Sequence, residues 1–511
     1  MSQRPIRFFH AGHITEVDGL APTTSVLTWL REHARRTGTK EGCNEGDCGA
    51  CTVLIGELDA QGRLDLRPVN ACIALLPTLD GKALLTVEDL QGRHPAQQAL
   101  ALGHGTQCGF CTPGFVMTLA ALHQRHSVGG TTPSRPELAD ELSGNLCRCT
   151  GYRPILEAGV AMFQHKRPAI DETPIVAALR QLRGDPPLEQ PGFAAPHTVE
   201  QLAAARLTDP EARLLSGGTD VALWVNKQFR ELPRLLYLGR VEALRGLREV
   251  GPTDPATDDG AHLEIGAAVT LHEAWAALAE RWPMLREMGL RFASPPVRHA
   301  GTLVGNLANG SPIGDAAPVL LALDAQLVLR RGEALRLLPL DAFYVDYMKT
   351  RLEPGEWVQA VRIPLAGQAS AGSSDATPMR TVLRAYKHSK RFDSDISAVA
   401  AGLWLQLEGD RVRAARLAFG GMAATVRRAK AAEAAMLGQP WTEATILAAM
   451  AALDAEFTPM TDLRASAAHR RRIAGQLLKR FWLETRADDP LPPSAVSVWA
   501  AADAHALQVQ P

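Results

Sequence analysis

All eight cysteines of this 511-residue chain lie before residue 150, where they form two groups of four. The first group contains Cys43, Cys48, Cys51 and Cys72, and the second contains Cys108, Cys111, Cys147 and Cys149. Random usage would scatter eight cysteines along the whole chain. Four thiolates at these spacings can hold one [2Fe–2S] cluster. The sequence therefore predicts two such clusters, with the eight cysteines as ligands, in a protein that transfers electrons.

The first group follows the spacing of plant-type ferredoxins, Cys43-x4-Cys48-x2-Cys51, with the fourth ligand, Cys72, in a separate segment. Glycines stand between these ligands and let backbone amides approach the inorganic sulfides. The alternative is a structural zinc site. Zinc sites favour paired Cys-x2-Cys segments, so the four-residue gap and the glycines favour the iron–sulfur cluster.

The second group consists of two cysteine pairs, each followed by a helix signal. Cys108-x2-Cys111 precedes Thr112-Pro113-Gly114 and an apolar run, and Cys147-x-Cys149 precedes a similar segment at 150–154. Both pairs are predicted at helix N-termini, where the helix dipole stabilises thiolates and the charge of a cluster. Two disulfides are the alternative, and a cytoplasmic location disfavours them.

Charge and hydropathy indicate which partners the chain does not bind and in which compartment it is expected. The chain has 54 basic and 55 acidic residues and a net charge of −1. This balance argues against nucleic acid or an anionic membrane as a partner. No apolar run reaches the roughly 18 residues of a membrane span. The N-terminal segment has no apolar signal core, so we expect a cytoplasmic protein.

Two glycine-rich stretches mark the middle of the chain. One comprises Leu214, Leu215, Ser216, Gly217, Gly218, Thr219, Asp220 and Val221. The other runs from Gly301 to Gly310 and is followed by residues 311–315. Backbone amides in such turns can cradle a pyrophosphate. The alternative is that they are ordinary turns, and neither matches the Gly-x-Gly-x-x-Gly dinucleotide fingerprint.

Three long motifs around the cysteines, at 41–51, 107–114 and 144–152, give the chain a family resemblance. Residues 1–165 resemble the paired [2Fe–2S] module of the xanthine oxidase family of molybdenum hydroxylases. The resemblance implies an α+β multidomain fold. A β-grasp ferredoxin-like domain and a four-helix-bundle [2Fe–2S] domain would be followed by a two-part FAD-binding α/β domain. A C-terminal α+β domain with a three-stranded sheet and helices would complete it.

The expected domain boundaries follow from this order and from changes in periodicity and composition. Helices are predicted near 95–103, 113–126, 136–144 and 154–165. We expect a ferredoxin-like domain at 1–88, a helical [2Fe–2S] domain at 89–166, a linker at 167–191, an FAD-binding domain at 192–368, a C-terminal flavoprotein domain at 379–486 and a weakly ordered tail at 487–511. The segment 366–378 is expected to be a surface loop.

The resemblance also implies the residues that contact the flavin. Residues 214–221 and Thr302, Leu303, Val304, Gly305 and Asn306 would hold the FAD phosphates, and Asp315 a hydroxyl. Phe292 would lie against the isoalloxazine ring, Lys387 would make another FAD contact, and Tyr347 would lie against NAD⁺. The alternatives are a core aromatic for Phe292, a solvated charge run for Lys387 and a strand-edge tyrosine for Tyr347. Val304 replaces a glycine that some relatives carry.

The resemblance implies the electron-transfer subunit of a two-subunit xanthine dehydrogenase, which oxidises hypoxanthine and xanthine to urate. A large partner subunit would bind the molybdopterin cofactor, in a dimer of such pairs. The Cys108 group would face molybdenum, and the Cys43 group would face FAD, which delivers electrons to NAD⁺. No catalytic residue is assigned to this chain. A related aldehyde or N-heterocycle molybdenum hydroxylase is one alternative, and a non-enzymatic zinc-binding protein is another.

Overall fold

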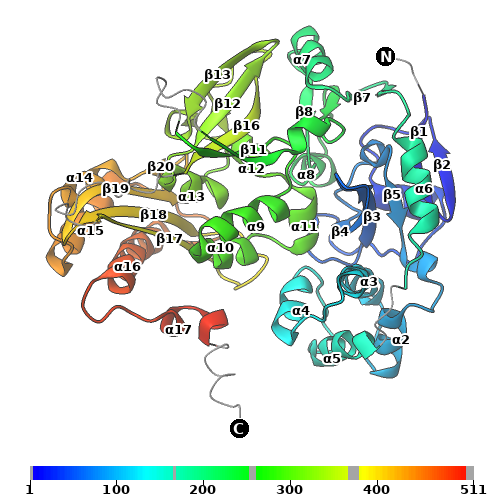
Figure 1. Ribbon diagram of the computed structural model, residues 1–511, viewed down its shortest axis with the longest axis horizontal. Coiled ribbons are helices and arrows are strands. Elements are labelled where there is room, and N and C mark those ends of the chain that lie inside the picture. The colour runs from blue at the N-terminus through cyan, green and yellow to red at the C-terminus, as the bar shows by residue number, and fades with distance from the viewer. Residues whose placement is uncertain (1–3, 165–168, 252–259, 366–378, 502–511) are drawn as a thin grey trace. The chain divides into compact units, whose positions relative to one another are not determined.

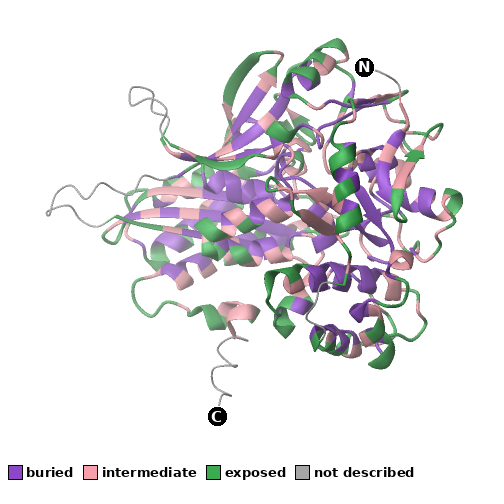
Figure 2. Ribbon diagram, turned by 45° about the vertical axis from the view of Figure 1, so that its right-hand side comes forward, coloured by how far each residue is buried: buried purple, intermediate pink, exposed green. Residues whose placement is uncertain are grey.

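The computed structural model describes residues 4–164, 169–251, 260–365 and 379–501. The chain divides into two compact units. Unit 1 comprises Met1–Arg245, Ala268–Glu273 and Ala293–Thr302, and unit 2 comprises Gly246–Ala267, Ala274–Phe292 and Leu303–Pro511. Buried residues lie both in strands and on the inner faces of helices, and the outer helix faces are exposed (Figure 2).

Unit 1 begins with a mixed sheet whose strand order is β2-β1-β5-β3-β4. Strands β1 and β5 are parallel, and the other neighbours are antiparallel. The strands are β1 (Ile6–His10), β2 (His13–Val17), β3 (Thr52–Leu58), β4 (Leu64–Asn70) and β5 (Ala83–Leu85). A turn of α-helix, α1 (Val26–Thr28), begins at its N-cap Ser25 and continues as the π-helical turn η1 (Trp29–His33). Leu27 and Trp29 are buried with Phe8 and Val53, which confirms the ferredoxin-like domain.

The next domain is helical, as predicted. Its helices are α2 (Pro95–Leu102), α3 (Thr112–Gly129), α4 (Arg135–Glu141) and α5 (Arg153–Ala161). Figure 1 shows these helices as one group. Helix α3 also contacts strands β3 and β4 of the preceding sheet. Phe115 and Leu119 of α3 share a core with Leu138 and Ile155. Short 3₁₀ turns flank these elements at η2 (Leu76–Leu79), η3 (Val87–Leu90) and η4 (Met162–Gln164).

The segment expected as a linker, 167–191, contains regular structure. Helix α6 (Thr173–Leu182) begins with Pro174 in its first turn and buries Ile175, Leu179 and Leu182. These apolar positions recur at helical spacing, so the helix has a seam that packs against the ferredoxin-like domain. Strand β6 (Leu188–Gln190) then pairs with β7 (Phe193–Ala195). The prolines at 186 and 187 indicated a linker, but they only separate α6 from β6.

The rest of unit 1 is a small sheet with the order β6-β7-β9-β8. Strands β7 and β8 both pair with β9 in parallel. Its further elements are α7 (Val199–Thr208), β8 (Arg213–Leu215), α8 (Val221–Asn226), β9 (Leu235–Tyr237), η5 (Glu242–Arg245) and α11 (Pro295–Ala300). The parallel pairing brings the end of β8, where residues 216–220 begin, to the same sheet edge as the end of β9.

Unit 2 contains a second sheet, ordered β10-β11-β16-β12-β13 and antiparallel at each pairing. Its strands are β10 (Leu247–Val250), β11 (His262–Gly266), β12 (Gln326–Arg331), β13 (Ala334–Pro339) and β16 (Trp357–Pro364). The accompanying elements are α9 (Leu271–Arg281), η6 (Pro283–Leu285), α10 (Arg286–Arg291), α12 (Leu303–Ala308), α13 (Ala316–Ala322), η7 (Leu340–Ala342) and the hairpin β14 (Tyr344–Asp346) and β15 (Lys349–Thr350).

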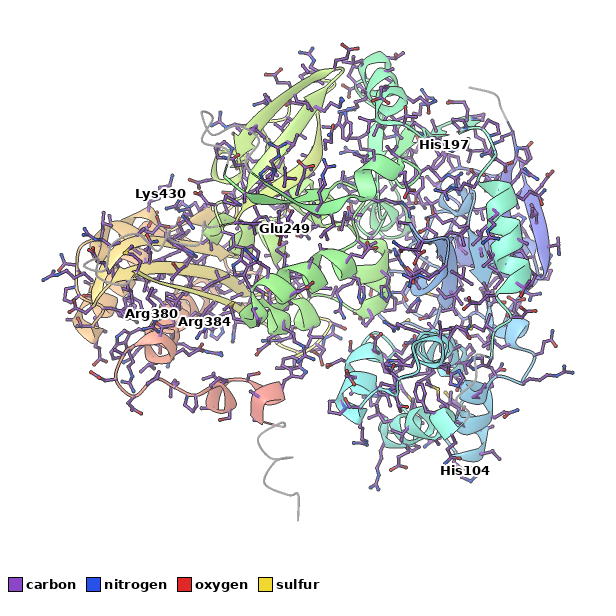
Figure 3. All side chains as sticks on the ribbon, viewed as in Figure 1. His104, His197, Glu249, Arg380, Arg384 and Lys430 are labelled. Carbon is purple, nitrogen blue, oxygen red and sulfur yellow. The ribbon has the colours of Figure 1, made fainter. Side chains whose placement is uncertain are left out.

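The C-terminal sheet of unit 2 has the order β17-β18-β19-β20. Its elements are β17 (Met379–His388), β18 (Val399–Glu408), β19 (Arg411–Gly420), β20 (Arg427–Arg428), α14 (Lys430–Met436), α15 (Glu443–Glu456) and α16 (Ala467–Thr485). The expected sheet had three strands. Strand β20 is the fourth, and its two residues are too few to show an alternating pattern. Arg384 of β17, labelled in Figure 3, binds Glu484 of α16 at 2.8 Å and ties the helix to the sheet.

Part of the predicted tail is described and contains α17 (Pro493–Val496). The predicted surface loop at 366–378 lies outside the described residues, as does the end of the predicted tail from 502. None of the described helices is both long and apolar enough to cross a lipid bilayer.

Candidate redox centres

The first cysteine group lies where the loop before β3 meets the segment after β4. Cys51 and Cys72 are buried, and Cys43 and Cys48 are partly exposed. Side-chain interactions connect Cys43 with Cys48 and with Cys72, and connect Cys51 with Cys72. The backbone N–H of Cys48 also donates to Cys43 Sγ at 3.4 Å. The four predicted ligands therefore come together from two segments.

Hydrogen bonds among the thiols of this group shift their pKa values in opposite directions. A hydrogen bond from Cys48, with a second from Cys72, lowers the pKa of Cys43, whereas the bonds to Cys43 raise the pKa of Cys48 and of Cys72. The Cys72 thiol likewise lowers the pKa of Cys51. Iron binds thiolates, so cluster assembly would displace the thiol protons. This donor set fits a [2Fe–2S] cluster.

The second group forms from two sulfur pairs. Cys149 Sγ lies 3.7 Å from Cys108 Sγ, and Cys111 interacts with Cys147. Cys111 is the residue just before α3, whereas Cys147 and Cys149 lie several residues before α5. Among the described residues, no group of three or more histidine, cysteine or carboxylate side chains is arranged to hold one metal ion. The sulfurs instead meet two by two, and each pair can serve one iron of a two-iron cluster.

The electrostatics of the second group differ from the sequence expectation for Cys111. Burial, together with the neighbouring Cys147, raises the pKa of Cys111 to about 12. The helix N-terminus was expected to favour the thiolate, but desolvation and the second sulfur outweigh the dipole. At Cys147 burial opposes ionisation, yet hydrogen bonds from the Thr150 hydroxyl at 3.2 Å and N–H at 3.5 Å lower its pKa.

The two cysteine groups are joined by direct hydrogen bonds. The N–H of Leu146, next to Cys147, donates to the Cys48 carbonyl at 2.9 Å. The buried Asn145 amide donates to the Gly49 carbonyl and to Thr52 Oγ1, both at 3.1 Å, and accepts from Thr118 Oγ1 at 2.7 Å. A side chain of the second motif therefore fixes the backbone of the first.

This junction requires glycine. A Cβ placed on Gly114 would lie 2.1 Å from the Gly49 carbonyl oxygen, and one on Gly49 would lie 2.2 Å from the Gly144 carbonyl oxygen. Both distances are far below van der Waals contact, so a side chain at either position would force the segments apart. The glycines of the two motifs thus let the ligand loops of the two groups pack backbone to backbone.

The loop at 216–220 follows β8 and precedes α8. A Cβ on Gly217 would lie 2.0 Å from the Ala300 carbonyl oxygen, so the loop packs directly on the segment that ends at Thr302. Gly218 has a φ of +73°, and a Cβ there would lie 3.5 Å from the carbonyl oxygen of Ile73, the residue after Cys72. Within unit 1 the glycine loop is therefore adjacent to the segment that ends at Thr302, the first residue of the second predicted phosphate-binding stretch, and to the first cysteine group.

Buried charges support this loop from the ferredoxin-like sheet. A cavity of about 90 Å³ is lined by Gly217 and Gly218 and by Glu57, Lys82 and Arg245. Glu57 accepts from Arg245 at 2.6 Å, and Lys82 Nζ donates to the Tyr237 hydroxyl at 2.9 Å. Burial opposes ionisation of Glu57, but Arg245 and Lys82 hold its pKa well below the usual range. These pairs join the ferredoxin-like domain to β9 and η5, beside the glycine loop.

The other predicted flavin contacts belong to unit 2. Asp315 binds Lys387 in a buried ion pair, and Ser397 Oγ donates to the same carboxylate at 2.5 Å. Lys387 is 8% exposed, which contradicts the alternative of a solvated charge run. Leu303 and Val304 are buried. Among described residues the buried Asn306 Oδ1 has no hydrogen-bond partner, so it offers a free acceptor to a ligand.

The two predicted aromatic contacts have different surroundings. Phe292 is 7% exposed and packs on Trp275 with ring centroids 5.9 Å apart, as a core aromatic does. Tyr347 is 62% exposed in the turn between β14 and β15. Their roles toward flavin and NAD⁺ stay predictions.

Sequence reasoning did not single out three residues of this arrangement. Asn145 lies inside the motif at 144–152, but the sequence alone indicates no role for it. Asn226 and Lys227, at the end of α8, contact the cysteine loops. Asn145 could have been identified from its position two residues before Cys147, because an amide side chain beside a ligand pair can bind the ligand loops. The other two belong to no recognisable motif, since only the fold brings them to the cysteines.

Four domain families match successive parts of the chain. The 2Fe-2S iron-sulfur cluster binding domain matches 8–76, and the [2Fe-2S] binding domain matches 86–159. The FAD binding domain in molybdopterin dehydrogenase matches 189–366, and the CO dehydrogenase flavoprotein C-terminal domain matches 384–485. The chain therefore carries two [2Fe–2S] domains and an FAD-binding domain, as predicted, and the zinc alternative loses its basis.

Curated relatives match over nearly the whole chain. A xanthine dehydrogenase from Emericella nidulans is 31% identical over 95% of this chain, and aldehyde oxidase 2 from Cavia porcellus is 30% identical over 93%. The chain spans 39% of the length of each. Among solved structures, a chain of carbon monoxide dehydrogenase from Hydrogenophaga pseudoflava is 29% identical, with a TM-score of 0.49, over 56% of this chain and 94% of its own. By its domain content the chain is the iron–sulfur and FAD portion of a molybdenum hydroxylase of the xanthine dehydrogenase family.

Proposed function

We propose that this chain is the electron-transfer subunit of a xanthine dehydrogenase and carries electrons from a partner subunit to NAD⁺. The partner would bind the molybdopterin cofactor and oxidise hypoxanthine and xanthine to urate. The family, with its two [2Fe–2S] domains and FAD-binding domain, supports the electron-transfer role. When bound, the clusters supply one-electron carriers and FAD supplies a two-electron carrier.

The observation that carries the proposal is the continuity of contacts through unit 1. The second cysteine group reaches the first through the 2.9 Å hydrogen bond from Leu146 to Cys48. The first group reaches the glycine loop where Ile73, beside Cys72, lies against Gly218. Eight thiols and one glycine loop thus follow each other without an intervening domain. Such an order suits stepwise transfer from the second group to the first and on to FAD.

The residues of the chain have distinct proposed roles. The eight cysteines would hold the irons, and residues 214–221 and 302–306 would hold the FAD phosphates with backbone amides. The Asp315 carboxylate would accept a hydrogen bond from an FAD hydroxyl. Lys387 and Ser397 bind this carboxylate and fix its position. Phe292 would flank the flavin ring, and Tyr347, exposed in its hairpin turn, would contact NAD⁺. In the xanthine dehydrogenase assembly we expect a dimer of two-subunit pairs.

The test is co-purification of the full chain with its native partner, followed by an assay of hypoxanthine with NAD⁺. We expect about four iron atoms per chain, bound FAD and formation of NADH. Activity on an aldehyde or an N-heterocycle, with none on hypoxanthine, would instead identify the related hydroxylase. Zinc without iron in anaerobically purified protein would refute the electron-transfer function.

The nicotinamide assignment has its own test. Replacing Tyr347 by Ala should weaken NAD⁺ reduction, whereas reduction of an artificial electron acceptor and the FAD content stay normal. Because Tyr347 is 62% exposed, the substitution should leave the melting temperature unchanged. Loss of FAD from the Tyr347→Ala protein would show that the residue contacts the flavin site instead.

A further inference from the structure

Helix α8 ends in two polar residues that reach the first cysteine group. Asn226 Nδ2 donates to the carbonyl of Cys72 at 2.8 Å, and it lies 3.3 Å from Asn44 Oδ1 and 3.4 Å from the Asn44 carbonyl. A single amide therefore binds both segments that supply the predicted ligands. Asn226 is at the end of the helix that the glycine loop begins, so the contact comes from the FAD-binding part of unit 1.

Lys227 adds a positive charge at the same place. Its Nζ donates to the carbonyl of Cys43 at 2.6 Å and lies 3.5 Å from the carboxylate of Glu45. Lys227 and Glu45 are both about half exposed, so water screens part of their charge. The Lys227 ammonium group nevertheless binds the backbone carbonyl of Cys43, which is a predicted cluster ligand. The Glu45 carboxylate belongs to a residue that is not a predicted ligand.

Hydrogen bonds and charges near an iron–sulfur cluster set its reduction potential. Reduction adds one negative charge to the cluster, so a nearby cation and donors that polarise ligand peptides favour the reduced form. The same contacts fix the loop that carries Cys43 and the loop that carries Cys72 relative to each other. Simple packing between domains would not require an amide that bridges two ligand segments or an ammonium group on a ligand carbonyl.

We propose that Asn226 and Lys227 are positioning residues of the first cluster, which hold its ligand loops and raise its reduction potential from the FAD-binding side. This inference rests on the proposed electron-transfer function. It implies that the ferredoxin-like domain does not set the potential of its own cluster alone. The helix that follows the glycine loop makes this cluster a better electron acceptor from the second one.

The test is a redox titration of the full chain, purified anaerobically and monitored by electron paramagnetic resonance. The variants are Lys227→Gln, Asn226→Ala and the conservative Lys227→Arg. Lys479→Gln is the matched control, because Lys479 is similarly exposed and binds Glu443 at 3.1 Å in unit 2. A Cys149→Ser sample identifies which signal belongs to the first cluster.

We expect Lys227→Gln and Asn226→Ala to make reduction of the first cluster three- to tenfold less favourable, and tenfold corresponds to about 59 mV. The second cluster should keep its potential, and Lys227→Arg and Lys479→Gln should match the wild type. Loss of the first cluster alone from Asn226→Ala would also support the positioning role.

Unchanged potentials of both clusters in the two variants, with full iron content, would overturn the inference. So would loss of both clusters, because that result would show a general folding role. A wild-type protein without two [2Fe–2S] signals would refute the proposed function rather than this inference, so the two failures are distinguishable.

Discussion

The two cysteine groups do the same chemistry in opposite surroundings. In the first, Cys51 and Cys72 are only 2% and 1% exposed, and Cys43 and Cys48 are partly exposed. In the second, Cys108 and Cys149 are exposed. Large apolar side chains nearby are exposed as well, with Phe110 at 48%, Tyr152 at 39% and Leu146 at 38%.

This contrast in exposure fits the proposed electron path. The first group is surrounded by the ferredoxin-like sheet, by the second motif and by α8, all within unit 1. The second group is bound to the first through Asn145 and through the backbone of Leu146, whereas its Cys108 and Cys149 are exposed. Exposed apolar residues around an exposed ligand pair are typical of a surface that a partner covers. The contrast supports the proposed order, with the second group toward the partner.

The largest expected effect is loss of a cluster when one of its cysteine ligands is replaced. Replacing one ligand in each group distinguishes the two groups. Cys149→Ser should lower the iron content from about four to about two atoms and remove one of two resonance signals, with little change in melting temperature. Cys72→Ser should remove the other signal and also lower the melting temperature, because it places a hydroxyl in a buried core. Equal stability loss in both variants would contradict the contrast in enclosure.

The junction between the groups should be the next most sensitive place. Gly114→Ala brings a Cβ to 2.1 Å from the Gly49 carbonyl oxygen, and we expect a loss of about 1–3 kcal/mol in unfolding free energy. Gly129→Ala is the control in the same helix, since its Cβ would meet only Thr131 Oγ1 at 3.8 Å. That variant should be neutral or slightly more stable. Denaturant unfolding measures both, and equal midpoints would disprove the close packing.

A smaller loss is expected from Asn145→Ala, which leaves the Gly49 carbonyl and the hydroxyls of Thr52 and Thr118 without their shared partner. The cost should be about 1 kcal/mol, because the Gly49 carbonyl still accepts from the hydroxyl and the N–H of Thr52. Because the amide ties one ligand loop to the other, the magnetic interaction between the reduced clusters should also weaken. A variant that unfolds earlier but keeps that interaction would show that Asn145 stabilises the fold without setting the distance.

The smallest expected difference is kinetic. When the full chain is treated with ferricyanide and a chelator, iron should leave the exposed second group several-fold faster than the enclosed first group. Resonance spectra taken through the reaction distinguish the two losses. Addition of the partner subunit should slow only the faster phase. Simultaneous loss from both groups would remove the distinction between an open and an enclosed site.

The two [2Fe–2S] domains could be predicted because their candidate ligands are encoded locally. Cysteine spacing and the flanking glycines determine a ligand loop within a few residues, whereas the FAD-binding domain was implied only by the family resemblance. Helix α6 was missed although Thr173, Pro174 and the apolar spacing of Ile175 and Leu179 indicate a helix start and a buried face. The prolines that follow the helix obscure this signal, because proline-rich segments are typical of loops and linkers.

Other features could not be predicted because tertiary packing creates them. Strand β20 has two residues and exists only through its pairing with β19. Asn226 and Lys227 are ordinary residues at a helix end, and they gain meaning only when α8 meets the loops of Cys43 and Cys72. The pKa of Cys111 was expected to fall at a helix N-terminus, but burial and the Cys147 sulfur raise it.

The most direct test of the account is the magnetic interaction between the two clusters in the fully reduced full chain. The hydrogen bond from Leu146 to Cys48 and the packing of Gly114 on Gly49 bring the two ligand loops together. We predict two distinguishable resonance signals that split or broaden each other at low temperature. Two signals that add without any mutual effect would contradict a continuous path from the second cysteine group to the first.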